Sequence, residues 1–305
     1  MTIKIASQYA THSLTRVVGP IILSGLLASA VQAFPTGDQP FGVYDPDGSF
    51  ADSTEVTIEH LFLPWEDVFL PTLIDADTYA LERGRSVLVT IEPWTWNRSE
   101  RNTPRRLLSG VQSGEYDIYM RSICSVLNLF EAPVTVRWAQ EMEDRSGQFI
   151  WANWQPQELY IGAFQRMVDV CREEAPDINY MWSPLGYEYL DEYYPGDDYV
   201  DIIGLSVFGL QPWEEDILGA AQSFVDILGP RYERVVGFDK PIVVAELGYS
   251  GDAAYVAKWD SEVRLDYPQF PELEAVVYFH QKEVYPWPDG YGYPNWKFEH
   301  RVIEE

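Results

Sequence analysis

Short apolar runs rich in β-branched residues alternate with longer helical patterns from residue 41 to residue 279. Two of these runs, Val87–Ile91 and Ile242–Ala245, are almost continuously hydrophobic, as expected of parallel strands buried on both faces. The predicted strands are Phe41–Asp45, Val56–Phe62, Ser86–Glu92, Val134–Ala139, Ile178–Trp182, Asp201–Val207, Pro241–Glu246 and Ala275–Phe279. This repeated alternation predicts an α/β fold, a single (β/α)8 TIM barrel.

Helical patterns fill the intervals between the strands. They are predicted at Pro71–Arg83, Pro104–Ser113, Tyr116–Phe130, Pro156–Ala175, Trp213–Leu228 and Asp252–Tyr267. A doubly wound open sheet is the rival fold, but no Gly-rich phosphate turn follows the first strand. The chain has 305 residues, and a barrel of this kind occupies about 250 as one domain.

The first 33 residues read differently from the rest of the chain. An apolar run spans Val17–Ala30, and small residues lead up to Ala33. This pattern predicts a secretory signal over residues 1–33, cleaved near Ala33, with a catalytic domain at 34–305 that is secreted or periplasmic. The alternative is an N-terminal membrane anchor, but the run of about 14 residues is short of the roughly 20 that a spanning helix needs.

The charge balance restricts the partners. The chain has 48 Asp and Glu against 21 Lys and Arg, a net charge of -27, which repels nucleic acid and anionic membrane surfaces. Aromatic residues make up 15% of the chain, and sugar rings stack on such side chains. We therefore expect a polysaccharide partner for a monomeric protein. Four scattered His residues without a Cys/His cluster predict no metal and no cofactor.

Cys124 and Cys171 are the only cysteines, and each falls in a predicted helix. We expect two buried thiols. A disulfide is the alternative if the two helices are neighbours in an oxidising compartment.

Polar and aromatic segments follow the strands, where the loops of a barrel build its active site. Glu141 lies just past the fourth run and Glu246 closes the seventh, so both can face one sugar across the barrel mouth. Retaining glycosidases use two such carboxyls, one as nucleophile and one as proton donor. Arg137 is predicted to hold the nucleophile charged. The alternative is that these are two ordinary strand-end acids among 48.

Several segments carry a resemblance to a known family. The chain resembles glycoside hydrolase family 26, mostly β-mannanases with some β-1,3-1,4-glucanases and β-1,3-xylanases, in these segments: Ile91–Trp94, Arg137–Met142, Trp151–Pro156, Tyr180–Pro184, Tyr194–Gly204 and Lys240–Glu246. The resemblance implies that Glu141 is the acid/base and Glu246 the nucleophile of a (β/α)8 barrel.

The sequence departs from the mannanase pattern beside the scissile sugar. Gln140 stands where His is usual, Glu143 replaces a frequent Asn, Ser206 and Phe208 replace Asp-x-Tyr, and Phe279 or His280 replaces Trp. Because buried hydrogen-bond donors decide which sugar is accepted, these changes leave mannan specificity open.

Further residues are candidates for substrate binding. Glu92 binds a sugar hydroxyl or forms a salt bridge, and Glu143 and Asp144 bind a hydroxyl or are solvated. Tyr194 and Asp197 are expected to shape a loop. The aromatic candidates for sugar platforms, with core packing as the alternative, are Trp94, Trp96, Trp151, Trp154 and Trp182.

The leading hypothesis is a secreted retaining endo-β-glycanase that hydrolyses β-1,4- or mixed-linkage β-1,3-1,4-glucan, or β-1,4-mannan. Its substrate-binding residues would be Arg137, Gln140, Glu92, Trp94, Trp151, Trp154, Trp182, Phe208 and His280, with no metal. The competing hypotheses are a polysaccharide-binding barrel without turnover, and a transglycosylase that acts in exopolysaccharide processing with the same two carboxylates.

Overall fold

A computed structural model describes residues 34–95 and 103–304. The chain divides into two units, Met1–Gln32 and Ala33–Glu305, and only the second falls in the described ranges. The predicted signal at 1–33 and the platform candidate Trp96 lie outside the described residues. Within those ranges, no helix combines the length and the apolar character that a membrane span requires.

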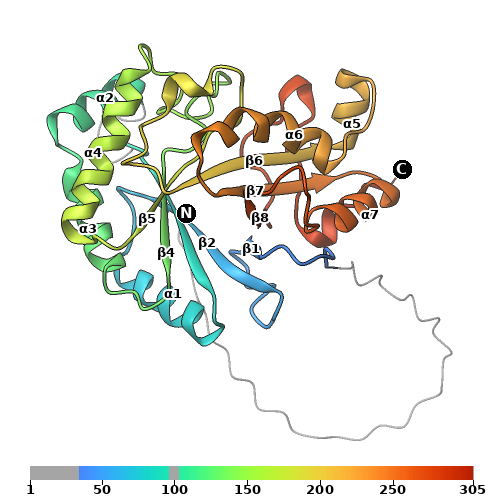
Figure 1. Cartoon of the computed structure of the whole chain (residues 1–305), viewed down its shortest axis with the longest axis horizontal. Helices are drawn as coiled ribbons and strands as arrows, with labels where there is room; N and C mark the ends of the chain where they lie inside the picture. Colours follow the sequence, from blue (N-terminus) through green and yellow to red (C-terminus); the bar gives the residue numbers. More distant parts are fainter. Residues whose placement is uncertain (1–33, 96–102, 305) are drawn as a thin grey trace, which may run out of the picture. The chain divides into compact units, whose positions relative to one another are not determined.

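Eight parallel strands close into a barrel, each paired with the next and β8 with β1. Figure 1 shows this sheet with its flanking helices. The strands are β1 Phe41–Tyr44, β2 Val56–Pro64, β3 Ser86–Glu92, β4 Val134–Trp138, β5 Asn179–Trp182, β6 Ile202–Leu210, β7 Ile242–Ser250 and β8 Leu273–Phe279. The predicted barrel is confirmed, and the open-sheet alternative is excluded.

All eight predicted strands are confirmed, and β6 and β7 extend furthest beyond their expected ends. β6 runs to Leu210 and β7 to Ser250, and every residue of β7 is buried. A sequence reading ends a strand at the first polar residue, whereas the ladder continues from Ser206–Glu246 to Leu210–Ser250. Glu246 therefore lies within its strand, and the prediction that it closes the strand was wrong.

Helices cover the outside of the barrel, as the alternation predicts. They are α1 Pro71–Glu82, α2 Pro104–Ser113, α3 Asp117–Leu127, α4 Glu158–Glu174, the single turn α5 Gln211–Trp213, α6 Phe224–Val235 and α7 Ala253–Glu262. Short turns also occur at η1 Leu190–Tyr193, η2 Glu214–Leu218, η3 Val236–Phe238, η4 Pro288–Gly290 and η5 Phe298–His300.

The helix predicted at Trp213–Leu228 was wrong in its bounds. Gly219 takes a left-handed conformation that ends the turn before it. Ser223 then caps a new helix, α6, through a reciprocal pair of hydrogen bonds with Asp226. This capping box sets the residue at which α6 begins, and the apolar pattern of the sequence alone did not locate that residue.

Cys124 on α3 and Cys171 on α4 form a disulfide, with their Cα atoms 5.3 Å apart. The expectation of two free thiols was therefore wrong. Both cysteines are fully buried where α3 and α4 lie side by side, so they face each other across the helix contact.

The core has two layers. A large cluster fills the space between the sheet and the helices, and a smaller one fills the barrel interior. The interior cluster consists of Leu88, Met181, Val243, Ala245, Ala275 and Val277. Its presence makes the barrel a solid support, so side chains at the carboxyl ends of the strands rest on a packed floor.

Candidate active site

Glu246 reaches the barrel interior because β7 carries one extra residue. Leu205 pairs with Val244 and Ser206 pairs with Glu246, so Ala245 has no partner position on β6. Ala245 faces the interior, and strict alternation would point the next side chain outward. The bulge turns the Glu246 carboxyl back into the barrel, a common use of bulges beside active sites.

A buried polar chain crosses the barrel beneath this carboxyl. Arg137 on β4 has no exposed surface, and its Nη1 donates to Glu246 Oε1 at 2.6 Å and to Thr90 Oγ1 at 3.3 Å. His60 Nε2 lies 2.7 Å from the same threonine oxygen. Burial, assisted by the charge of Arg137, holds the pKa of His60 well below its usual value, which favours a neutral ring. The cation among these linked polar side chains is therefore Arg137.

Glu141 follows β4 in a strained segment. Its φ is +57° and that of Ala139 is +49°, both in the left-handed region that residues other than glycine rarely adopt. The backbone N–H of Glu141 donates to Ser183 O at 2.8 Å, which ties this turn to the residue after β5. Strain of this kind persists only when surrounding contacts enforce it, and it is concentrated at functional sites.

Ser206 brings the two carboxylates together. It lies directly beside Glu246 in the ladder between β6 and β7, and its hydroxyl donates to Glu141 Oε1. Burial and, next, the charge of Glu246 raise the pKa of Glu141 to about 8, against the opposing effects of the Ser206 hydrogen bond and Arg137. One carboxyl is thus protonated near neutrality while its neighbour bonds a cation.

Glu92 ends β3 at the same face. Its two oxygens accept hydrogen bonds from Gln140 Nε2 at 3.0 Å and Trp94 Nε1 at 3.2 Å. Burial raises the pKa of Glu92, and the charge of Glu246 adds to the effect. Glu92, Gln140 and Trp94 therefore form one connected group beside Glu246. Among the described residues, no cation forms a salt bridge with Glu92, so that alternative is not what the structure shows.

Three of the predicted platform residues are buried. Trp151 is 0% exposed, Trp182 0% and Trp154 4%, so none presents a ring face to a sugar. Trp151 donates from its indole to Gln140 O at 2.7 Å, and Trp154 donates to Ile150 O at 3.1 Å. The packing alternative describes all three, and the platform prediction for them was wrong. Trp94 is half-buried and keeps part of its surface accessible.

His280 does not face the site. It is 1% exposed, its Nδ1 accepts from Phe298 N at 3.3 Å, and its ring meets Phe50 edge-on at 4.9 Å. Because neighbouring residues of a strand point to opposite faces, Phe279 points inward instead. Phe279 lies 6.2 Å from Phe208, the other predicted contact, and both are half-buried. The prediction of His280 as a substrate contact was wrong.

Two loop acids after β4 are structural in this conformation. Glu143 is fully buried, and its Oε1 accepts from Gly186 N at 2.8 Å. Asp144 Oδ1 accepts from Ser146 N at 3.0 Å. Neither is the solvated or hydroxyl-binding acid that the sequence predicted.

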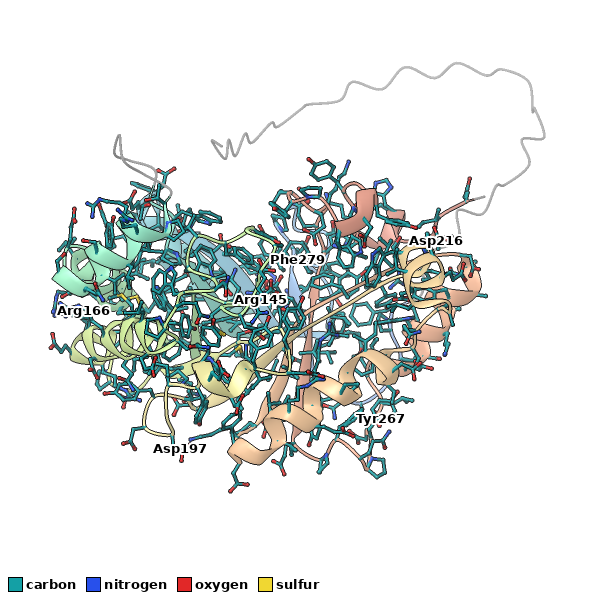
Figure 2. All side chains as sticks on the ribbon, turned by 90° about the horizontal axis from the view of Figure 1, so that it is seen from above. Arg145, Arg166, Asp197, Asp216, Tyr267 and Phe279 are labelled. Carbon is teal, nitrogen blue, oxygen red and sulfur yellow. A yellow bond between two sulfur atoms is a disulfide. The ribbon has the colours of Figure 1, made fainter. Side chains whose placement is uncertain are left out.

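Tyr194 and Asp197 shape the loop after β5, as predicted. The Tyr194 hydroxyl donates to Asp197 at 2.8 Å, and its ring stacks on Phe238 at 4.0 Å. Asp197 lies at the edge of the molecule in Figure 2, whereas Phe279 and Arg145 lie toward the middle of that view.

Tyr44 is a site residue that sequence reasoning missed. It ends β1, its ring stacks on Phe279 at 5.3 Å, and burial raises its pKa to about 12 with contributions from Glu92 and Glu246. The sequence signal that could have identified Tyr44 was its place at the end of the strand that neighbours β8. Across residues 34–95 and 103–304, no group of three or more His, Cys, Asp or Glu side chains is placed to hold a metal ion.

Comparisons with known proteins agree with this geometry. The family model described as glycosyl hydrolase family 26 matches residues 92–264. Endoglucanase H of Acetivibrio thermocellus is 24% identical over 255 residues, which are 76% of this chain and 26% of that protein. Beta-1,3-xylanase TXYA of a Vibrio species is 28% identical over 121 residues, 37% of this chain and 25% of that protein. The chain thus spans about a quarter of the length of these curated relatives.

Solved structures share the fold. The catalytic domain of the family 26 endo-β-1,4-mannanase from Bacillus sp. JAMB-750 superposes with a TM-score of 0.60 at 15% identity, covering 85% of this chain and 79% of that one. A modular endo-β-1,4-mannanase from Cellulomonas fimi gives 0.61 at 17% identity, covering 79% and 64%. The model match extends from the end of β3 to the end of α7 and includes both carboxylates, and this chain belongs to glycosyl hydrolase family 26.

Proposed function

We propose that the protein is an exported retaining endo-β-glycanase that hydrolyses internal bonds of a neutral β-linked polysaccharide. The candidate polymers are β-1,4- or mixed-linkage β-1,3-1,4-glucan and β-1,4-mannan. The observation that carries the proposal is the position of Ser206, which lies beside Glu246 in the sheet and donates a hydrogen bond to Glu141. This link favours the short carboxyl separation of retaining enzymes, about 5–5.5 Å, over the longer one of inverting enzymes.

In the first step, Glu246 attacks the anomeric carbon and Glu141 protonates the departing oxygen. Arg137 occupies Oε1 of Glu246, so Oε2 is the oxygen available for attack. Ser206 occupies Oε1 of Glu141, so Oε2 is available to carry the proton. The bond from the anomeric carbon to the leaving oxygen breaks as the ester bond to Glu246 forms, and Glu141 becomes a carboxylate.

In the second step, Glu141 takes a proton from water as that water attacks the anomeric carbon. The ester bond breaks, Glu246 returns to its ionised form beside Arg137, and the sugar leaves with its original configuration. A transglycosylase would replace this water with a sugar hydroxyl, so analysis of products at high oligosaccharide concentration separates the two activities.

The names of the relatives guide the choice of substrate. They are an endoglucanase, a β-1,3-xylanase and endo-β-1,4-mannanases, all named for neutral β-linked polymers. Glu246 interacts electrostatically with Glu92 and Glu141, and its charge disfavours an acidic sugar at the same place by repulsion.

Export is supported by the signal-like pattern of residues 1–33 and by the disulfide between Cys124 and Cys171, a bond typical of oxidising compartments. Expression of the full sequence in a secreting bacterial host, followed by N-terminal sequencing, tests it. The proposal expects an exported protein that begins near Phe34, and full-length protein retained with the cells contradicts it.

Activity is tested with a panel of glucans, mannans and xylans assayed for new reducing ends. The wild type should release them from at least one β-linked polymer, and Glu141→Ala and Glu246→Ala should each abolish the release. Asp169→Ala, an exposed position on α4, serves as the control that keeps activity. Binding without product on every polymer would favour the polysaccharide-binding barrel, and unchanged hydrolysis in both glutamate variants would contradict the assignment.

A further inference from the structure

An arm formed by residues 281–296 follows β8 and is here called the β8 hairpin. Three backbone hydrogen bonds join its two arms, from Glu283 N to Pro294 O at 2.9 Å, from Trp287 N to Gly292 O at 2.6 Å and from Trp296 N to Gln281 O at 3.2 Å. Because it leaves the carboxyl end of a barrel strand, the hairpin stands on the same face as Glu141 and Glu246.

The hairpin is held in place by the segment after β6. Trp213 donates from its indole to Asp289 Oδ2 at 2.9 Å, and the Tyr291 hydroxyl donates to Asp216. In one contact the donor belongs to the segment after β6 and in the other to the hairpin, and together they fix the tip of the arm. The hairpin is therefore a positioned wall rather than an unattached loop.

Aromatic rings line the side of the hairpin that faces the barrel. Trp296 lies 5.2 Å from Phe208 and Trp287 lies 6.3 Å from it, measured between ring centroids. Phe208 in turn lies 6.2 Å from Phe279, which stacks on Tyr44. Tyr44, Phe208, Phe279 and Trp287 are each half-buried, so ring surface remains accessible. Such surfaces bind the C–H faces of sugar rings.

Glu283 is the acid within this aromatic wall. It is half-buried, and its Oε1 accepts from the Trp296 indole at 2.8 Å. Burial and, to a smaller extent, the charge of Glu246 raise the pKa of Glu283 to about 7. A carboxyl held in a fixed orientation near Glu246 is suited to exchange hydrogen bonds with a sugar hydroxyl, both as acceptor and, when protonated, as donor.

The topology determines which part of the substrate lies here. Glu141 follows β4 and, in the proposed function, stands beside the departing sugar. In a closed barrel of eight strands, β8 lies opposite β4. The sugar units that stay attached to the anomeric carbon extend away from Glu141, and thus toward the β8 hairpin.

Building on the proposed function, we propose that the β8 hairpin binds a neutral pyranosyl unit on the glycone side of the scissile bond, stacked on its aromatic rings and hydrogen-bonded to Glu283. Glu246 interacts electrostatically with both Glu92 and Glu283, so an acidic sugar would be repelled from this position.

The test compares Glu283→Ala and Glu283→Gln with the wild type. The polymers are mixed-linkage β-glucan and β-1,4-mannan, and the small substrates are para-nitrophenyl β-cellobioside and β-mannobioside. Both sugars of such a glycoside lie on the glycone side, because the nitrophenyl group is what leaves. On whichever polymer and glycoside the wild type cleaves, Glu283→Ala should lower kcat/KM about tenfold through a lost hydrogen bond, and Glu283→Gln should recover most of it.

Glu274→Ala is the matched control, because Glu274 is exposed on β8 and should leave kcat/KM unchanged. Unfolding midpoints verify that each variant is folded. Equal kcat/KM for Glu283→Ala and the wild type, or a loss seen with polymers and absent with nitrophenyl glycosides, would overturn the inference. A wild type that cleaves none of these substrates is a different outcome, since it contradicts the proposed function and with it the basis for a glycone subsite.

Discussion

Arg137 Nη1 donates to Glu246 Oε1 at 2.6 Å from a position with no exposed surface. The remaining nitrogens of the guanidinium, Nε and Nη2, have no hydrogen-bond partner among the described residues. Within this part of the chain, the buried cation is therefore balanced by one carboxylate. The same contact sets a positive charge against the carboxyl group that attacks in the proposed mechanism.

Replacing Arg137 should impair both activity and stability. In Arg137→Met, Glu246 loses its charged hydrogen-bond donor, so kcat/KM should fall by about tenfold or more. Loss of one partner of a buried ion pair should also lower the free energy of unfolding by about 3 kcal/mol. Initial rates and urea unfolding measure the two effects. Arg137→Lys keeps the charge and should retain more of the activity and of the stability, and equal losses in the two variants would argue against a charge effect.

The alkaline limb of the pH profile should report Glu141. Its pKa is raised to about 8, and the first step needs its protonated form. Activity should therefore be lost as the pH rises through about 8, provided that proton donation limits the rate. A nitrophenyl glycoside with a very acidic leaving group needs little protonation, so its kcat/KM should lose much of this dependence. The same alkaline limb on both kinds of substrate would point to a different titrating group.

Ser206 should act as a positioning residue for Glu141 and so influence the pH at which the alkaline limb falls. Its hydroxyl donates to Glu141 and stabilises the ionised carboxylate, so Ser206→Ala should raise the pKa of Glu141 and move the alkaline limb upward. Ser183→Ala is the matched control, because the Ser183 hydroxyl is buried and has no hydrogen-bond partner among the described residues. A downward shift in Ser206→Ala, or an equal shift in Ser183→Ala, would disprove the role.

Glu143 should make stability depend on pH. Burial raises its pKa from 4.5 to about 7, so the folded state binds this proton more tightly than the unfolded state does. Its contribution to stability is then complete below about pH 4.5 and is lost as the pH rises toward 7. Glu143→Gln should reduce the loss of unfolding free energy between pH 5 and 8 by about 2 kcal/mol, measured by urea unfolding.

The control for this effect is Glu233→Gln, an exposed glutamate on α6. That variant should retain the wild-type pH dependence. If Glu143→Gln also retains it, burial of Glu143 does not govern stability in this range.

The order of strands and the position of both carboxylates could be predicted from the sequence, because buried parallel strands leave continuous apolar runs. The bulge that turns the Glu246 side chain into the barrel could not. It depends on the extra residue Ala245, and a bulge is a matter of pairing between strands that a single run does not encode. The link from Ser206 to Glu141 was missed for the same reason, since it depends on which residues of β6 and β7 lie side by side.

Aromatic residues were the least predictable part of the site. Trp151 and Trp182 are of the residue type that forms sugar platforms, yet both are buried in the core. Trp287 and Trp296 come late in the chain, after the last predicted strand, and reach the site only because the β8 hairpin folds back over Phe208. Burial of an aromatic ring is decided by distant elements, which the local sequence does not specify.

The central claim is retention through Glu246 with Glu141 as acid/base. Its most direct test is proton NMR of the reducing end released in the first minutes of hydrolysis, before mutarotation, on the polymer that the wild type cleaves. If Glu246 forms a glycosyl ester, the β-anomer should appear first and the α-anomer should follow only as mutarotation proceeds. Initial release of the α-anomer would contradict it, because inversion excludes a glycosyl ester on Glu246.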